Sequence, residues 1–257
     1  MKVGLSMLFC VGEPFSLLLE KLNKIDVEYV EILDDGLHAL NDRRVKALKR
    51  VARSRDIEFT VHAPVADINI ASPNAVLRRA ILRRLEKSIT NSRKLDCRLW
   101  VFHPGLKTGI SHFYPGLDWG LNLGSVRDLL KVAQKQGVEI SIENVPETVP
   151  FLLKSAADFS RFYSELDEDL CLTLDVGHAN INHQIDDFID KFRSKIVHVH
   201  VSDNEGDNDT HRGIGHGTVE WRNVADSLKR IKYNNIVMLE SFEHIEESLQ
   251  ILQNLFG

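Results

Sequence analysis

The feature of this 257-residue chain that most restricts its fold is a regular alternation of short apolar runs with longer amphipathic segments. The short runs are rich in Val, Ile and Leu, as strands are. They occupy residues 3–8, 29–33, 58–62, 99–103, 139–143, 170–175, 196–201 and 236–240. The sequence therefore predicts eight strands.

The segments between these runs carry apolar residues at helical spacing. They occupy residues 15–25, 45–52, 76–89, 126–133, 159–166, 185–192, 224–231 and 245–256. Strands that alternate with helices favour a parallel sheet, because parallel neighbours need a crossover long enough to contain a helix. Eight such units close into a barrel without free edges. We expect an α/β fold with a single (β/α)8 TIM barrel over residues 1–257, with an open doubly wound sheet as the alternative.

Composition narrows the classes of partner. The chain has 32 basic and 37 acidic residues and a net charge of -5, so charge gives no general attraction to DNA. No apolar run approaches the roughly 20 residues that span a membrane. The three cysteines are too few and too scattered for a disulfide framework, which favours a cytoplasmic protein. The chain has no GxGxxG motif and no P-loop, so we expect no nucleotide cofactor.

Six of the eight predicted strands run into a potential metal ligand at their carboxyl ends. In chain order, and including the loop after the seventh strand, the candidates are His62, His103, Glu143, Asp175, His178, His200, Asp209, His211 and Glu240. In a parallel barrel these ends open on one face. Carboxylates gathered there would be desolvated and would repel one another, and a divalent cation removes both penalties.

The candidate ligands are histidines and carboxylates, with no cysteine. This set suits Zn²⁺, Mn²⁺, Co²⁺ or Fe²⁺, whereas Ca²⁺ or Mg²⁺ alone would prefer an all-oxygen shell. Nine candidates exceed the coordination of one ion, so we expect two or three ions and a bridging carboxylate. His198 lies two residues before His200, and we expect it one layer deeper in the barrel. Arg212 and His216, in the loop after the seventh strand, are candidates for substrate binding.

The motifs VHAP, FHPG, IEN, LDVGHA, HVSD, DTH and LES, in this order, resemble the xylose isomerase-like barrel superfamily. They most closely resemble its endonuclease IV family of apurinic/apyrimidinic endonucleases, and the segment INIASP, with Asn69 as a further substrate-binding candidate, adds to the likeness. The resemblance implies three zinc ions. The first would be held by His62, His103 and Glu143, the second by Glu143, Asp175, His200 and Glu240, and the third by His178, Asp209 and His211.

The main expectation from this resemblance is a metal-dependent phosphodiesterase. An ionised water held by the metal ions would attack a phosphodiester such as an abasic site in DNA, with Glu143 or Glu240 orienting that water. One feature opposes a DNA substrate. Family members that repair DNA insert a bulky side chain from the loop after the third strand, where this chain has Val65 and Ala66.

The same superfamily supplies the alternative, a sugar or sugar-phosphate isomerase or epimerase. These enzymes resemble the chain at four positions, where one Mn²⁺, Co²⁺ or Mg²⁺ would be bound: Glu143, Asp175, His200 and Glu240. The two glutamates would then move a proton at carbon. That reaction leaves four further candidates without an evident task, which is why the hydrolase is the main expectation: His62, His103, Asp209 and His211. A barrel that binds a metal or sugar without catalysis is the third hypothesis.

Overall fold

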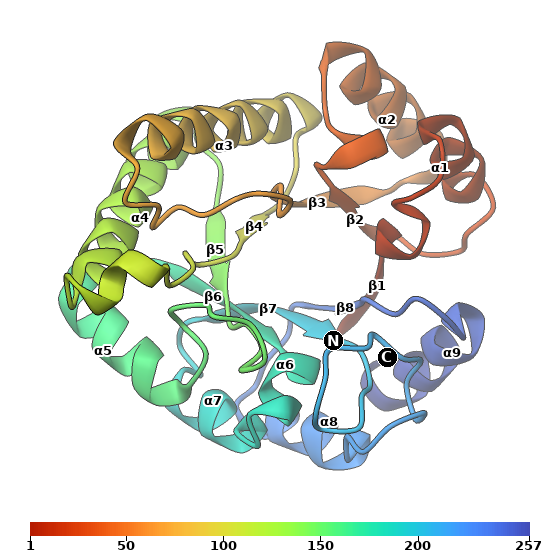
Figure 1. The fold of residues 1–257 in the computed structure, drawn as a ribbon. Helices are drawn as coiled ribbons and strands as arrows, with labels where there is room; N and C mark the ends of the chain where they lie inside the picture. The colour runs from red at the N-terminus through yellow and green to blue at the C-terminus, as the bar shows by residue number, and fades with distance from the viewer.

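The computed structural model describes residues 1–257, and its eight strands form a closed barrel (Figure 1). Every strand is parallel to its neighbours in sequence order, and the last pairs with the first. The strands are β1 (Lys2–Ser6), β2 (Tyr29–Leu33), β3 (Glu58–His62), β4 (Trp100–Phe102), β5 (Ile140–Glu143), β6 (Cys171–Asp175), β7 (Ile196–Val201) and β8 (Ile236–Leu239). The predicted (β/α)8 barrel is confirmed, and the open sheet is wrong.

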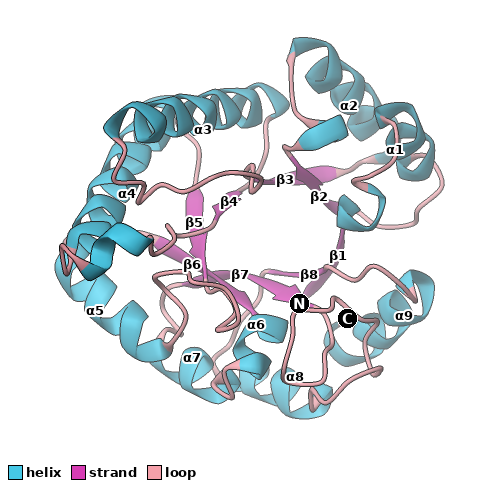
Figure 2. Cartoon of the chain, in the orientation of Figure 1, coloured by secondary structure: helices cyan, strands magenta, loops and turns pink.

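The helices form a ring outside the strands (Figure 2). They are α1 (Phe15–Leu22), α2 (Asp42–Arg55), α3 (Ala75–Leu95), α4 (Leu117–Gln136), α5 (Ala156–Leu166), α6 (Val176–Ile181), α7 (Ile185–Lys191), α8 (Trp221–Arg230) and α9 (Ile245–Phe256). Three short 3-10 helices, η1 (Met7–Cys10), η2 (Gly36–His38) and η3 (Gly109–His112), lie in loops that follow strands. No helix combines the length and hydropathy needed to cross a membrane.

Local hydrogen bonds explain where several helices begin and end. The Asn74 side chain accepts from the first backbone N–H groups of α3, and α5 begins with a capping box between Ser155 and Asp158. The helices α2 and α3 end at Asp56 and Asp96, both in the left-handed conformation. That conformation stops helical hydrogen bonding and turns the chain back toward the next strand.

The strands are buried on both faces, as a parallel sheet enclosed by helices requires. Apolar side chains pack between the barrel and its helices in one large core. The barrel interior, in contrast, contains polar groups, such as the hydroxyls of Ser141 and Thr173, which lie 2.6 Å apart. Near the chain ends, the Met1 ammonium group donates to the carbonyl oxygen of Phe256 (2.8 Å), which joins β1 to α9.

The register of the barrel brings the strand ends to one level. Asp175 at the end of β6 is the direct partner of His200 on β7, and His200 is in turn the partner of Met238 on β8. Glu143 at the end of β5 pairs with Thr173, which lies two residues before Asp175 on β6. Side chains from distant parts of the sequence therefore share one opening, called the mouth below.

Candidate metal centre

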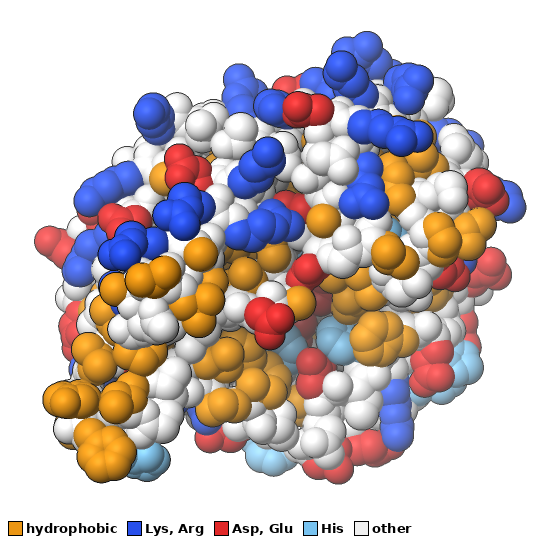
Figure 3. Space-filling model, turned by 45° about the horizontal axis from the view of Figure 1, so that its top comes forward, with side chains coloured by type: hydrophobic (Ala, Val, Ile, Leu, Met, Phe, Trp, Pro, Cys, Tyr) orange, Lys and Arg blue, Asp and Glu red, His pale blue; other side chains and the backbone are white.

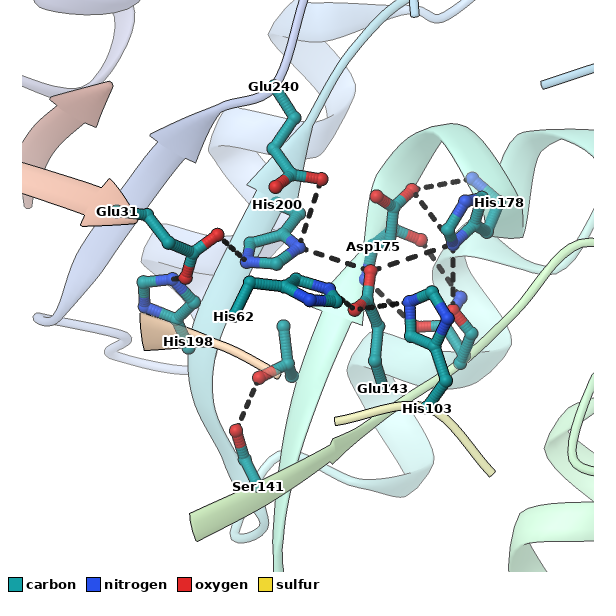
Figure 4. Close-up of polar contacts among 12 residues, drawn as sticks. Glu31, His62, His103, Ser141, Glu143, Asp175, His178, His198, His200 and Glu240 are labelled. Carbon is teal, nitrogen blue, oxygen red and sulfur yellow. Dashed lines mark hydrogen bonds and ion pairs between the residues drawn. The ribbon is translucent and has the colours of Figure 1, made fainter. Parts of the chain in front are cut away.

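Four buried side chains meet at the mouth: Glu143, Asp175, His200 and Glu240 (Figure 4). One potential ligand atom from each lies within 4.8 Å of all the others. The Nδ1 atom of His200 lies 3.1 Å from Glu143 Oε1 and 3.3 Å from Glu240 Oε2. We call this set the four-residue centre. It joins the ends of β5, β6, β7 and β8.

Asp175 provides an observation that fits a cation in the four-residue centre. Its Oδ1 atom accepts from the backbone N–H of His178 (2.6 Å), but its Oδ2 atom is buried without a hydrogen-bond partner. Burial, assisted by the nearby charges of Glu143 and Asp209, raises the pKa of Asp175 to about 6. An unpartnered buried carboxylate oxygen is costly, and three carboxylates with one imidazole suit Mn²⁺, Co²⁺, Mg²⁺ or Zn²⁺.

Two histidines flank this centre on the side of β3 and β4. The Nε2 atoms of His62 and His103 each lie 3.2 Å from Glu143 Oε2, and their rings meet edge to face. Burial alone would lower the pKa of His62, but its hydrogen bond to Glu143 and the charges of the nearby carboxylates together outweigh burial and raise the pKa to about 9. Burial prevails at His103 and lowers its pKa. Glu143 therefore contacts both the four-residue centre and this pair.

A second flanking group lies on the side of β6 and the loop after β7. Asp209 Oδ2 lies 3.1 Å from His178 Nε2 and 3.2 Å from His211 Nε2. The other ring nitrogens contact carbonyl oxygens, that of Asn144 for His178 (2.8 Å) and that of Glu240 for His211 (2.6 Å). All nine sequence-predicted ligands thus converge on the mouth.

The charges of the carboxylates keep protons on several imidazoles. Burial alone would lower the pKa of His200, but three carboxylates around its ring, chiefly that of Glu240, outweigh burial and raise this pKa well above its usual value. In the same way, Asp175 and Asp209 raise the pKa of His178 to about 10 against the effect of burial. A divalent cation in the four-residue centre would take the place of the His200 proton.

A cavity of about 160 Å³ opens beside the centre. It is smaller than the roughly 300–1,000 Å³ of pockets that hold drug-sized ligands. Its lining consists of Ser6, Leu8, Leu33, His62, Val65, His103, Glu143, His178, Asp209, His211, Glu240 and Phe242, with neither Lys nor Arg. Figure 3 shows histidine and acidic side chains in a hollow bordered by hydrophobic ones, while most Lys and Arg of that face lie away from it.

Sequence reasoning missed one buried carboxylate of the barrel interior. Glu31, in the middle of β2, is fully buried, and its Oε1 atom lies 3.3 Å from His200 Nε2. Burial alone would raise the pKa of Glu31, but His200 and His198 outweigh it and hold that pKa well below its usual value. The signal was present in the sequence, because a carboxylate inside the apolar strand YVEIL needs a buried partner.

The three predicted substrate-binding residues do not line the cavity. The Asn69 amide oxygen accepts from the backbone N–H groups of Ala71 and Leu106, so its side chain ties two loops together. The Arg212 guanidinium forms an ion pair with Glu205. The His216 ring stacks on His244 at the outer rim, with Nε2 3.4 Å from Glu247. This arrangement gives no support to a role for these residues in substrate binding.

Comparisons with known proteins point to sugar epimerases. A D-psicose 3-epimerase of Ruminiclostridium cellulolyticum is 26% identical to this chain, over 87% of the chain and 77% of the epimerase. The crystal structure of a D-tagatose 3-epimerase-like protein superposes with a TM-score of 0.93 at 28% identity, and covers 99% of this chain and 97% of its own. A protein of Methanocaldococcus jannaschii is 33% identical over 83% of this chain and 81% of its own length.

These findings overturn the expectation of an endonuclease IV-like phosphodiesterase, because the named relatives are epimerases and not hydrolases. The structure supplies a physical reason for the difference. The loop after β3 presents only Val65 and Ala66, and the Asp35 carboxylate holds the backbone N–H groups of both (2.9 and 2.8 Å). That loop therefore has no side chain that could open a base stack, and the cavity has no Lys or Arg to meet phosphate.

A family model independently covers nearly the whole barrel. The model describes the xylose isomerase-like TIM barrel and matches residues 19–255. The matched region includes seven of the eight strands and every residue of the four-residue centre. The closed barrel and the arrangement of its mouth agree with that match. This chain belongs to the xylose isomerase-like TIM barrel family.

Proposed function

We propose that this protein is a divalent-metal-dependent epimerase or isomerase of a free ketose. The observation that carries the proposal is the four-residue centre, in which four buried ligands from four strands converge beside a small cavity. The similarity to a D-psicose 3-epimerase supports sugar chemistry at this place in the barrel. The alternative that sequence analysis kept open is thus the better explanation.

The chemistry requires the exchange of one proton at a carbon atom beside a carbonyl group. A divalent cation bound by the four-residue centre would polarise the carbonyl and the neighbouring hydroxyl of the sugar. Glu143 on β5 and Glu240 after β8 reach the centre from different sides of the barrel (Figure 4). One carboxylate removes the proton from one face of the carbon, and the other returns a proton to the opposite face.

The lining of the cavity favours a free sugar over a sugar phosphate. It contains no Lys or Arg, and the nearby Arg212 is engaged by Glu205. Imidazole and carboxylate groups on one side can exchange hydrogen bonds with sugar hydroxyls. Leu8, Leu33 and Phe242 form an apolar side that suits the C–H faces of a sugar ring or chain.

Within this proposal, one cation occupies the four-residue centre. The remaining five predicted ligands surround the substrate and hydrogen-bond its hydroxyls: His62, His103, His178, Asp209 and His211. Their contacts with Glu143 and with one another hold them at the cavity wall. The centre contains three carboxylates, so Mn²⁺, Co²⁺ and Mg²⁺ fit it as well as Zn²⁺ does.

The proposal is tested by assaying metal-free protein on D-psicose, D-tagatose, D-fructose and L-ribulose, before and after addition of Mn²⁺ or Co²⁺. We expect chromatography to detect the C3 epimer or aldose isomer of at least one ketose, with activity lost in EDTA and restored by the metal. Asp175→Asn, in the centre, should abolish this activity, and Glu205→Gln, at the outer rim, should not. A metal-loaded protein without activity on any of these sugars would contradict the proposal.

A further inference from the structure

Glu31 is a buried charged residue that the proposed reaction does not use. Its side chain points from β2 toward the His200 ring, on the opposite side of that ring from Glu143 (Figure 4). Glu31, His198 and Thr60 are each at most 1% exposed. Desolvation of a carboxylate costs free energy unless the charge is paired, so Glu31 needs a group to pair with inside the barrel.

The two ring nitrogens of His200 face different carboxylates. Nδ1 faces Glu143 and Glu240 in the centre, at 3.1 and 3.3 Å. Nε2 faces Glu31 Oε1 at 3.3 Å, an ion-pair distance, and both atoms are buried without a hydrogen-bond partner. The ring therefore lies between the mouth and Glu31, and Glu31 is the group available to take its Nε2 proton.

The second oxygen of Glu31 is held from another direction. Thr60 Oγ1 donates to Glu31 Oε2 (3.0 Å), and His198 Nε2 lies 3.5 Å from the same oxygen. The His198 ring in turn meets the His200 ring edge to face at 5.0 Å. The hydrogen bond from Thr60 holds Oε2, while Oε1 faces His200.

We propose that Glu31 is a positioning residue for the metal centre, which accepts the Nε2–H of His200 and thereby presents the Nδ1 lone pair to the cation. Thr60 and His198 keep the Glu31 carboxylate in place. Carboxylates that orient a metal-bound histidine typically change metal affinity by 10- to 100-fold when they are removed. The inference rests on the proposed cation site and adds a residue that does not contact substrate.

The direct test is the dissociation constant for Mn²⁺, measured by isothermal titration calorimetry on Glu31→Gln and on the parent protein. Glu31→Gln keeps the shape of the side chain but loses its charge, and we expect affinity to fall by about 10- to 100-fold. Ser141→Ala is the matched control, because it disrupts a buried polar pair of the same barrel that does not contact the centre. Its affinity should stay within about twofold of the parent protein.

A second readout separates positioning from general stability. In histidine-labelled protein loaded with diamagnetic Mg²⁺ or Zn²⁺, two-dimensional ¹⁵N NMR should show His200 with a proton on Nε2 and none on Nδ1. The Nε2 proton should shift upfield in Glu31→Gln and remain unchanged in Ser141→Ala. If Glu31→Gln does not fold, Thr60→Val is the substitute, because it removes the hydrogen bond that holds the Glu31 carboxylate. It should shift the Nε2 proton of His200 in the same direction.

Three outcomes would overturn the inference. Unchanged Mn²⁺ affinity in a folded Glu31→Gln is one, and a proton on Nδ1 of His200 in the loaded protein is another. The third is a second ion bound by Glu31, His198 and His200, whose potential ligand atoms also lie within 4.8 Å of one another. A parent protein that binds no divalent cation would instead refute the proposed function.

Discussion

At the scale of single residues, Glu143 is the most connected side chain of the mouth. Its carboxylate contacts His200 in the four-residue centre and both histidines on the side of β3 and β4. A change at this position therefore affects metal binding and proton transfer together. Its side chain lies at the mouth and outside the hydrophobic core, so we expect the isosteric Glu143→Gln to change activity and leave the fold intact.

The first prediction concerns the charge of Glu143. Glu143→Gln should lower the epimerisation rate by about 100-fold or more, because the amide cannot accept the substrate proton. Circular dichroism should show an unchanged fold. Rate measurements at saturating Mn²⁺ check the prediction, and a variant within tenfold of the parent rate would show that Glu143 is not one of the two bases.

The second prediction compares two histidines of the mouth. His103 flanks the centre, whereas His200 lies in it. His103→Ala should bind Mn²⁺ nearly as the parent does, because it loses only a substrate contact, while His200→Ala should lose measurable Mn²⁺ binding. Calorimetry with the two variants side by side checks this, and equal losses of affinity would mean that His103 also holds an essential ion.

The third prediction is a pH dependence of metal affinity. The carboxylates around His200 raise its pKa well above the usual value, so the metal-free ring is protonated at neutral pH. A cation needs the lone pair that this proton occupies, and therefore binding weakens as pH falls and strengthens as pH rises toward the raised pKa. We expect about a tenfold loss of Mn²⁺ affinity per pH unit, with about one proton released. Equal dissociation constants at pH 6 and pH 8 would contradict this account.

Residue chemistry also shows what the sequence can and cannot predict at the mouth. All nine predicted ligands converge there, because seven stand at or just after the end of an apolar strand and Asp209 and His211 stand in the loop after β7. Glu31 was missed because it lies inside a strand and not at its end. Asn69 and His216 stand in loops, and their partners depend on loop contacts that have no periodic signal.

At the scale of elements, the segment between β7 and α8 depends on one buried carboxylate. Asp203 accepts hydrogen bonds from the backbone N–H groups of Gly215 and Val219 and from the indole N–H of Trp221 (2.9, 3.1 and 2.9 Å). A Cβ at Gly217 would lie only 2.4 Å from Asp203 Oδ1, so the loop closes tightly around this side chain. The same loop carries two residues of the cavity wall.

The fourth prediction is that Asp203→Ala destabilises the protein. The substitution leaves several buried N–H groups without acceptors and should lower the free energy of unfolding by roughly 2–4 kcal/mol. Glu205→Gln in the same loop is the control, and should change it by less than about 0.5 kcal/mol because its carboxylate is exposed. Urea unfolding measures the free energy of unfolding of both variants. A loss below about 1 kcal/mol for Asp203→Ala would show that this carboxylate does not stabilise the loop.

The order of the elements was predictable, and some of their limits were not. All eight strands form where apolar runs indicate them, since burial on both faces requires such runs. The helix α4 begins nine residues before the predicted 126–133. Its first turns bury polar residues such as Asp118 and Asn122, so the apolar spacing that indicates a helix is missing there. The short helix α6 follows β6 directly, where the ligand motif concealed the helical pattern.

At the scale of the whole molecule, barrel closure brings positions 62 and 240 to one mouth and so defines the site. Closure does not determine the reaction. The same strand-end ligands resemble both endonucleases and epimerases, and the sequence alone favoured the hydrolase through the additional histidines. The small cavity without Lys or Arg and the epimerase relatives reverse that choice.

The central claim is that the metal-loaded protein breaks and remakes a carbon–hydrogen bond of a ketose. The most direct measurement is NMR of four sugars incubated in D₂O with the protein and one equivalent of Mg²⁺: D-psicose, D-tagatose, D-fructose and L-ribulose. A second incubation uses Mn²⁺ in place of Mg²⁺, and the Mn²⁺ is removed before the spectra are recorded. Deuterium at the carbon beside the carbonyl, together with the epimer or isomer, is the result that we expect. Full metal loading without deuterium in any of the four sugars would contradict the account.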